Sequence, residues 1–251
     1  MAIYTIGDLH LSFHENKPMS VFGGNWEGHE EKIRKDWKEK VKENDLVVLP
    51  GDFSWSTYLK DTYEDFSYLH ALPGKKLLLK GNHDYWWTTV TNMKRFLQEN
   101  HFDSIDFLYN SAYEFESYII AGTRGWGQNE EGEDKKLLKR EIGRLELSLE
   151  KASQLKENKE KEIIVFLHYP PITQNNLLNN EMSDFVKVMK KYDVKRCYYG
   201  HLHSSAIKEA VEGQHYGIDF KLVSADALDF RLWDIGHGDV DNVPNYSNFL
   251  T

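Results

Sequence analysis

The chain has 251 residues, a net charge of -9, and 40% hydrophobic and 28% charged residues. This composition is typical of a soluble globular protein with room for one large α/β domain or two small ones, and no apolar run approaches the ~20 residues of a membrane-spanning helix. The acidic balance argues against broad binding to nucleic acid or to an anionic membrane. The single cysteine, Cys197, excludes an internal disulfide, and together with the lack of a secretory signal it predicts a cytoplasmic protein.

Short apolar runs, most of them followed at once by polar residues, predict buried strands along much of the chain. These runs lie at 2–6, 46–49, 76–80, 118–121, 163–167 and 196–199. Apolar residues at helical spacing predict helices over 29–41, 61–72, 88–100, 133–157 and 181–192. The alternation of strands with helices favours a largely parallel sheet with right-handed crossovers.

The C-terminal part is expected to add two strands, over 216–224 and 227–235, joined by a turn near Asp226. Since we find no internal repeat and no interdomain linker, we interpret residues 1–235 as a single domain and 236–251 as a polar C-terminal tail. Residues 11–28 form a polar, glycine-bearing loop that is long enough to be a lid or the rim of a site.

Five of the predicted strands end in side chains that can bind a metal ion or move a proton. In chain order these are Asp8 with His10, Asp52, Asn82 with His83, His168, and His201 with His203. In open α/β sheets, functional groups gather at the carboxyl ends of the strands. We therefore expect these side chains to converge on one site.

The residue types suit metal ions. Carboxylate, imidazole and amide ligands together favour first-row divalent ions such as Mn, Fe, Zn or Co. The candidate ligands exceed what one ion usually takes, so we expect two divalent ions, with Asp52, alone on its strand end, as the bridge between them. Two such ions outweigh the charges of Asp8 and Asp52, which leaves the site positive and ready for a phosphate group. Because bound water can reach a pKa of about 7, attack by metal-bound hydroxide is the expected chemistry.

The motifs resemble those of the calcineurin-like metallophosphoesterase superfamily. The resemblance rests on Asp8-x-His10, Gly51-Asp52, Gly81-Asn82-His83-Asp84, His168 and Gly200-His201-x-His203, in the order of that family and from residue 8 to 203. Residues 83–87 and 122–126 also resemble a poorly characterised branch of bacterial predicted phosphohydrolases. The resemblance implies an α/β fold, a four-layer αββα sandwich of the metallophosphoesterase type.

The same resemblance implies roles for single residues. It implies one ion held by Asp8, His10, Asp52 and His203, and a second held by Asp52, Asn82, His168 and His201. By similarity, His83 is expected to protonate the leaving group or to steady the phosphoryl oxygens, and Asp84 to orient His83.

Several other residues have two possible interpretations. Arg124 could bind a substrate phosphate or form a structural ion pair. The tryptophans just past strand ends could line a substrate pocket or belong to the core: Trp55, Trp86, Trp87 and Trp126. Cys197 is expected to be buried. The histidines outside the strand ends are expected to have no special role: His14, His29, His70, His101, His215 and His237.

The sequence thus predicts a dinuclear metal-dependent phosphohydrolase that cleaves a phosphomonoester or a phosphodiester of a small substrate. One alternative is a nuclease on the same scaffold, against which the net charge and the absence of a Lys/Arg-rich stripe argue. The other is a non-catalytic metal-binding interaction scaffold, against which the full set of ligands and His83 argue. The sequence makes no prediction of the physiological substrate, the native metal or the oligomeric state.

Overall fold

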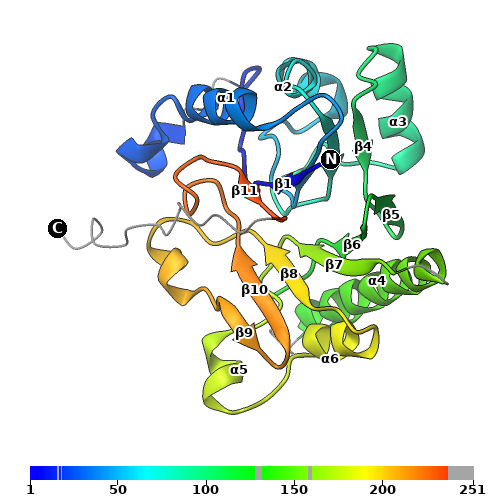
Figure 1. Ribbon diagram of the computed structural model, residues 1–251. Coiled ribbons are helices and arrows are strands. Elements are labelled where there is room, and N and C mark those ends of the chain that lie inside the picture. The colour runs from blue at the N-terminus through cyan, green and yellow to red at the C-terminus, as the bar shows by residue number, and fades with distance from the viewer. Residues whose placement is uncertain (16, 18, 128–131, 158–159, 237–251) are drawn as a thin grey trace.

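The computed structural model describes residues 1–15, 17, 19–127, 132–157 and 160–236, which form two sheets between outer helices (Figure 1). The first sheet has the order β11-β1-β2-β3-β4, in which β1 to β4 are parallel and β11 is antiparallel at one edge. Its strands are β1 (Ile3–Thr5), β2 (Leu46–Leu49), β3 (Lys75–Leu78), β4 (Ile105–Phe107) and β11 (Trp233–Asp234).

The second sheet has the order β5-β6-β7-β8-β10-β9, with β6, β7, β8 and β10 parallel and the two edge strands antiparallel. Its strands are β5 (Ala112–Phe115), β6 (Tyr118–Thr123), β7 (Glu162–Leu167), β8 (Arg196–Tyr199), β9 (Gly213–His215) and β10 (Ile218–Leu222). This mixed pattern leaves the central strands parallel, so their carboxyl ends meet at one edge.

Helices cover the outer face of each sheet (Figure 1). Above the first sheet lie α1 (His29–Lys40), α2 (Tyr63–His70) and α3 (Val90–Glu99), and on the far side of the second lie α4 (Gly132–Lys156) and α6 (Asp184–Lys191), with the short α5 (Gln174–Leu178) nearby. The described residues also form 3-10 helices at Met19–Phe22, Gly24–Trp26, Leu59–Thr62 and Ser204–Glu209. The four-layer αββα sandwich is thereby confirmed.

Strand β7 shows why the second sheet is buried on both faces. Ile164 and Phe166 belong to the apolar cluster shared with the first sheet, whereas Ile163, Val165 and Leu167 pack with the residues under α4 and α6. Successive side chains of a strand point to opposite faces, so a strand covered on both sides must be apolar throughout. The unbroken apolar runs seen in the sequence have this cause. Cys197 on β8 is fully buried, as predicted.

The predicted strand over 227–235 is wrong, apart from the two residues of β11. Residues 225–230 form a turn instead, closed by the bond from the Phe230 N–H to the Ala225 carbonyl, with positive φ at Asp229 and Phe230. Ala227, Leu228 and Phe230 are all buried, so the alternating pattern reflects apolar residues of a packed turn. The structure also contains the short strands β4, β5 and β9, which the sequence reading omitted.

No helix in the described ranges is long and apolar enough to cross a membrane. The single domain over 1–235 stays a prediction, and residues 237–251 of the proposed tail lie outside the described residues.

Candidate metal centre

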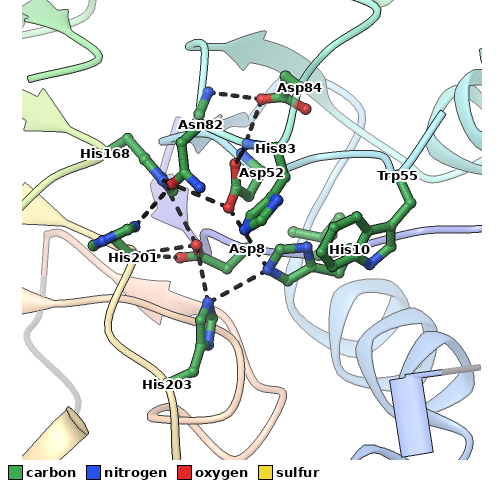
Figure 2. A network of polar contacts seen from close by, with 12 residues as sticks. Asp8, His10, Asp52, Trp55, Asn82, His83, Asp84, His168, His201 and His203 are labelled. Carbon is green, nitrogen blue, oxygen red and sulfur yellow. Dashed lines mark hydrogen bonds and ion pairs between the residues drawn. The ribbon is translucent and has the colours of Figure 1, made fainter. Parts of the chain in front are cut away.

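Side chains from both sheets meet where β1, β2, β3, β7 and β8 end (Figure 2). The first sheet brings Asp8, His10, Asp52, Asn82 and His83, and the second brings His168, His201 and His203. A hydrogen bond joins the residues of the two sheets, because the His201 N–H donates to the Asp8 carboxylate at 3.1 Å. All seven candidate ligands therefore lie in one site.

Two glycines allow the strand ends to approach one another so closely. A Cβ at Gly81 would lie 2.1 Å from Asp52 Oδ1, and a Cβ at Gly200 would lie 2.3 Å from Asp8 Oδ2. Both distances are far inside van der Waals contact, so any other residue would displace a carboxylate of the site. This gives a physical reason for the glycines that precede Asn82 and His201.

The backbone at the ligand positions adopts a conformation that costs energy. Asp8, His10, Asp52 and His201 have positive φ values of 58°, 47°, 51° and 75°. For residues other than glycine this region costs roughly 1–2 kcal/mol each. Such strain persists where the surrounding structure holds it in place, and it gathers at functional sites.

One group of candidate metal ligands surrounds the end of β1. The Nε2 atoms of His10 and His203 are 3.4 Å apart, and His203 Nε2 lies 3.2 Å from Asp8 Oδ1. His10 Nε2 is also 3.8 Å from Asp52 Oδ2. Two imidazole nitrogens facing each other beside carboxylate oxygens form a suitable pocket for a cation.

A second group lies against the end of β7. Asn82 Oδ1 is 2.6 Å from His168 Nε2 and 2.9 Å from His201 Nδ1. His168 Nε2 is 3.5 Å from Asp52 Oδ2. Asp52 Oδ2 thus lies within 3.8 Å of an imidazole nitrogen of each group. Asp8 Oδ1 does so as well, 3.2 Å from His203 Nε2 and 3.7 Å from His168 Nδ1, so the bridging role of Asp52 stays a prediction.

The electrostatics of the site favour bound cations. Burial raises the pKa of Asp52 well above its usual value, and the neighbouring Asp84 and Asp8 add to this rise. Burial lowers the pKa of His10 far below its usual value and that of His168 to about 3, so these imidazoles are neutral and have a free lone pair. At His203 burial acts in the same direction, but Asp8 and Asp226 outweigh it and raise the pKa to about 10. Positive charge is thus attracted to this position.

His83 lies beside the ligands without joining either group. Its backbone N–H donates to Asp52 Oδ1 at 2.7 Å, and its ring lies 4.4 Å from the Trp55 ring and 5.7 Å from the His10 ring. Burial, and after it the charge of Lys17, lower the pKa of His83 below its usual value. Nδ1 of His83 is buried without a hydrogen-bond partner among the described residues.

Asp84 does not orient His83 as the sequence reading expected, since no contact joins the two side chains in the described structure. Its oxygens accept bonds from the backbone N–H groups of Asp52 at 2.9 Å and Gly81 at 2.7 Å, and from Trp86 Nε1 at 3.0 Å. Burial raises the pKa of Asp84 to about 6 despite these bonds. Asp84 therefore connects the turn after β2 to the turn after β3.

Arg124 forms the structural ion pair that the sequence left as one of two interpretations. Its Nη2 lies 3.4 Å from Glu141 Oε1, and its guanidinium covers the Trp126 ring at 4.5 Å. Its Nε is buried without a partner in the described part of the chain. Binding of a substrate phosphate by Arg124 stays a prediction.

The four tryptophans fall into two groups. Trp86 and Trp87 are buried and belong to the core of the first sheet. Trp55 stacks on His10 at 4.8 Å, while the Trp126 ring lies 5.3 Å from Tyr169, which itself contacts the His201 ring at 4.1 Å. Of these four tryptophans, Trp55 and Trp126 are therefore the two nearest the site.

Asp226 supports His203 and was missed as a functional residue in the sequence. The His203 Nδ1–H donates to Asp226 Oδ1 at 2.8 Å, and the Ser204 N–H donates to Oδ2 at 2.9 Å. A carboxylate behind an imidazole fixes which nitrogen faces the ion. Asp226 follows β10, next to β8 in the sheet, so the strand-end pattern could have identified it.

His29 also has a role that the sequence did not indicate. Its Nε2 lies 3.0 Å from the carbonyl oxygen of Leu9, between Asp8 and His10, and its Nδ1 lies 3.1 Å from the carbonyl oxygen of Trp26. Trp26 in turn packs edge-on against His203 at 5.7 Å. His29 therefore holds the loop that carries two of the candidate ligands.

Changing Asp226 to asparagine is expected to weaken metal binding by about 10- to 100-fold, because His203 loses the charged acceptor that orients it. Titration of metal-free protein with Zn²⁺ against a chromogenic chelator would measure the change. Asp219→Asn on β10 is the matched control, since that residue lies at the other end of the same strand. Equal affinities of the Asp226 variant and the wild type would contradict the role given to Asp226.

A hollow of about 1230 Å³ adjoins the site. It is lined by Leu202, between His201 and His203, by Pro170, and by polar residues of α5 such as Gln174 and Asn176. None of the seven candidate ligands lines it. Its lining mixes apolar, uncharged polar and charged side chains, the last being Glu181, Asp184, Lys187 and Glu209.

Comparison with known proteins agrees with this geometry. A family model described as calcineurin-like phosphoesterase matches residues 1–205. One solved structure is similar with a TM-score of 0.57 at 12% identity, over 94% of this chain and 95% of that chain, which shows a shared fold alone. The protein of unknown function AQ665 from Aquifex aeolicus matches at 19% identity, 93% and 95% coverage and a TM-score of 0.47. Phosphopantetheinyl hydrolase (PptH) from Mycobacterium tuberculosis matches at 12% identity, 89% and 88% coverage and a TM-score of 0.47. A search of curated proteins found no match.

Proposed function

Because the chain belongs to the calcineurin-like phosphoesterase family, and so is a metal-dependent phosphoesterase, we propose that it is a dinuclear phosphohydrolase acting on a small phosphorylated substrate. The bond it cleaves is a phosphomonoester or a phosphodiester. A cytoplasmic location is part of the proposal, supported by the single cysteine.

The observation that carries this proposal is the position of Asp52. Its Oδ2 lies 3.8 Å from His10 Nε2 on one side and 3.5 Å from His168 Nε2 on the other. The donor set fits two first-row divalent ions, since each group offers imidazole nitrogens together with a carboxylate or amide oxygen. Asp8, His10, Asp52 and His203 would hold one ion, and Asp52, Asn82, His168 and His201 the other.

When bound, such ions supply Lewis acidity toward phosphoryl oxygens and a hydroxide nucleophile at neutral pH. The residues of the chain itself hold the ligand residues in place and supply a proton. Asp84 holds the turns that carry Asp52 and Asn82, and Asp226 holds His203. His83 lies beside His10 and Asp52 with a ring nitrogen that no described residue binds, so it is placed to donate a proton or a hydrogen bond to the leaving oxygen.

Removal of metal is expected to abolish hydrolysis of p-nitrophenyl phosphate and bis-p-nitrophenyl phosphate, because no described side chain near the ligands serves as a nucleophile in this proposal. Dialysis against EDTA followed by addition of Mn²⁺, Fe²⁺, Zn²⁺ or Co²⁺ would test this, with elemental analysis expected to give two ions per chain. Activity that survives full chelation would refute the proposal, and a stoichiometry of one would refute its dinuclear part.

A further inference from the structure

Lys17 is a cation near the site that binds no anion among the described residues. Its Nζ lies 3.5 Å from the centroid of the Trp55 ring. Within the described part of the chain this amine makes no hydrogen bond or ion pair, whereas other exposed lysines such as Lys191 and Lys195 pair with a carboxylate. In a chain with 40 acidic residues and 31 basic ones, an exposed amine that lies on the Trp55 ring without such a partner indicates a place for a foreign anion.

Described residues before and after Lys17 in the chain contact the body of the protein. Before it, the Ser12 hydroxyl donates to the Lys17 carbonyl oxygen at 2.7 Å, and the Phe13 N–H donates to Asp65 Oδ1 at 3.1 Å. After it, Met19 is buried and its Sδ accepts a bond from Trp55 Nε1 at 3.0 Å. The position of Lys17 over Trp55 is therefore built by the fold.

Trp55 connects this amine to the metal centre. The same indole stacks on His10 at 4.8 Å and contacts His83 at 4.4 Å, as Figure 2 shows for the three rings. Because the Lys17 amine and the His83 ring both contact this indole, Lys17 lies on the side of the site where His83 is.

Resting on the proposed function, in which His83 faces the leaving oxygen, we propose that Lys17 binds an anionic group on the leaving part of the substrate. The ions that Asp52 would bridge neutralise the charge of the scissile phosphate. A further cation beside His83 is therefore available to bind a second negative group. The substrate class that follows is a phosphoester whose leaving alcohol carries a phosphate or a carboxylate.

Matched pairs of phosphonates test this in the Mn²⁺-loaded protein. One pair is 3-phosphonopropionate with propylphosphonate, and a longer pair is 4-phosphonobutyrate with butylphosphonate. The members of a pair differ chiefly in a terminal carboxylate, and neither can be hydrolysed. Isothermal titration calorimetry of wild type is expected to show about tenfold tighter binding of the carboxylate member in at least one pair, the effect of one charge-assisted hydrogen bond.

Variants then assign the preference to Lys17. Lys17→Ala and Lys17→Gln are expected to bind both members of a pair equally, while Lys17→Arg keeps the preference because it keeps the charge. Lys191→Ala is the matched control. It removes one exposed lysine beside an aromatic ring, Tyr192, away from the site, and should leave the preference at its wild-type value.

The outcomes separate this inference from the function on which it rests. Absence of a preference in wild type, while p-nitrophenyl phosphate is still hydrolysed, would overturn the role of Lys17 alone. An equal loss of affinity for both members in Lys17→Ala would also overturn it, because Lys17 would then contact the phosphonate itself. Absence of both hydrolysis and phosphonate binding in the metal-loaded protein would refute the proposed function.

Discussion

Replacing Asp52 with asparagine is expected to lower turnover of a phosphoester by about a thousandfold or more. Asparagine has the shape of aspartate and can still accept the bond that the His83 N–H now donates to Oδ1 at 2.7 Å, so the turn should be retained. It lacks the negative charge that would hold two cations together. Loss of an interaction of this kind at the reacting centre costs about 4 kcal/mol of transition-state stabilisation. Steady-state kinetics and elemental analysis at saturating Mn²⁺ would measure both consequences.

The same change should not destabilise the metal-free protein. The pKa of Asp52 is raised in the folded state by burial, Asp84 and Asp8. A carboxyl with a raised pKa stabilises the fold at low pH, and this contribution is lost as the pH rises through the folded pKa. Above the usual pKa of an aspartate, ionising this carboxyl costs more in the fold than in the unfolded chain, and asparagine removes that cost. Thermal denaturation in EDTA should give a Tm of the variant at or above the wild-type value.

Asp45→Asn is the matched control, because Asp45 is also buried but lies before β2, at the opposite end of the strand that leads to Asp52. Its carboxylate accepts the N–H groups of Ala2 at 2.8 Å and Lys42 at 2.9 Å, so the change should affect stability and leave metal content at two. Retention of two ions and of normal turnover by the Asp52 variant would remove Asp52 from the bridge.

The convergence of the ligand residues could be predicted because it depends on local features. Each apolar run identifies a buried strand, and the strand fixes where the next polar side chain lies. Asp8 and His168 come from different sheets, 160 positions apart in the numbering, yet His168 Nδ1 lies 3.7 Å from Asp8 Oδ1. Parallel strands that end at one edge are sufficient to explain this approach. The family and the four-layer fold were predicted correctly for the same reason.

The errors concern contacts that arise only when distant segments pack together. Asp84 was expected to act on its neighbour His83, but its oxygens accept N–H groups of the turn after β2, which the sequence separates from it by about thirty residues. Asp226 was placed in a turn between strands, and its bond to His203 depends on β10 lying beside β8. Hydrogen bonds of this kind leave no periodic signal in the sequence, so the strand-end pattern could mark Asp226 as a candidate but not show its partner.

Replacing His83 with alanine is expected to lower turnover by about 10²- to 10⁴-fold, the usual contribution of a general acid. The size of the loss should depend on the leaving group. p-Nitrophenolate leaves without much help, so the loss on p-nitrophenyl phosphate should be at the low end. An alkyl phosphate needs its leaving oxygen protonated, so the loss there should be at the high end. A role of His83 in steadying the phosphoryl oxygens would instead lower both rates by the same factor.

The comparison is informative because the alanine variant should keep its metal ions. His83 belongs to neither ligand group, and the bond that ties this position to Asp52 comes from the backbone N–H, which alanine retains. His215→Ala on β9, away from the site, controls for the loss of an imidazole and should match wild type on both substrates. If the His83 variant is as fast as wild type on the alkyl phosphate, His83 does not assist the leaving group. The proposal that the leaving group lies on the side of the site where His83 is would then be wrong as well.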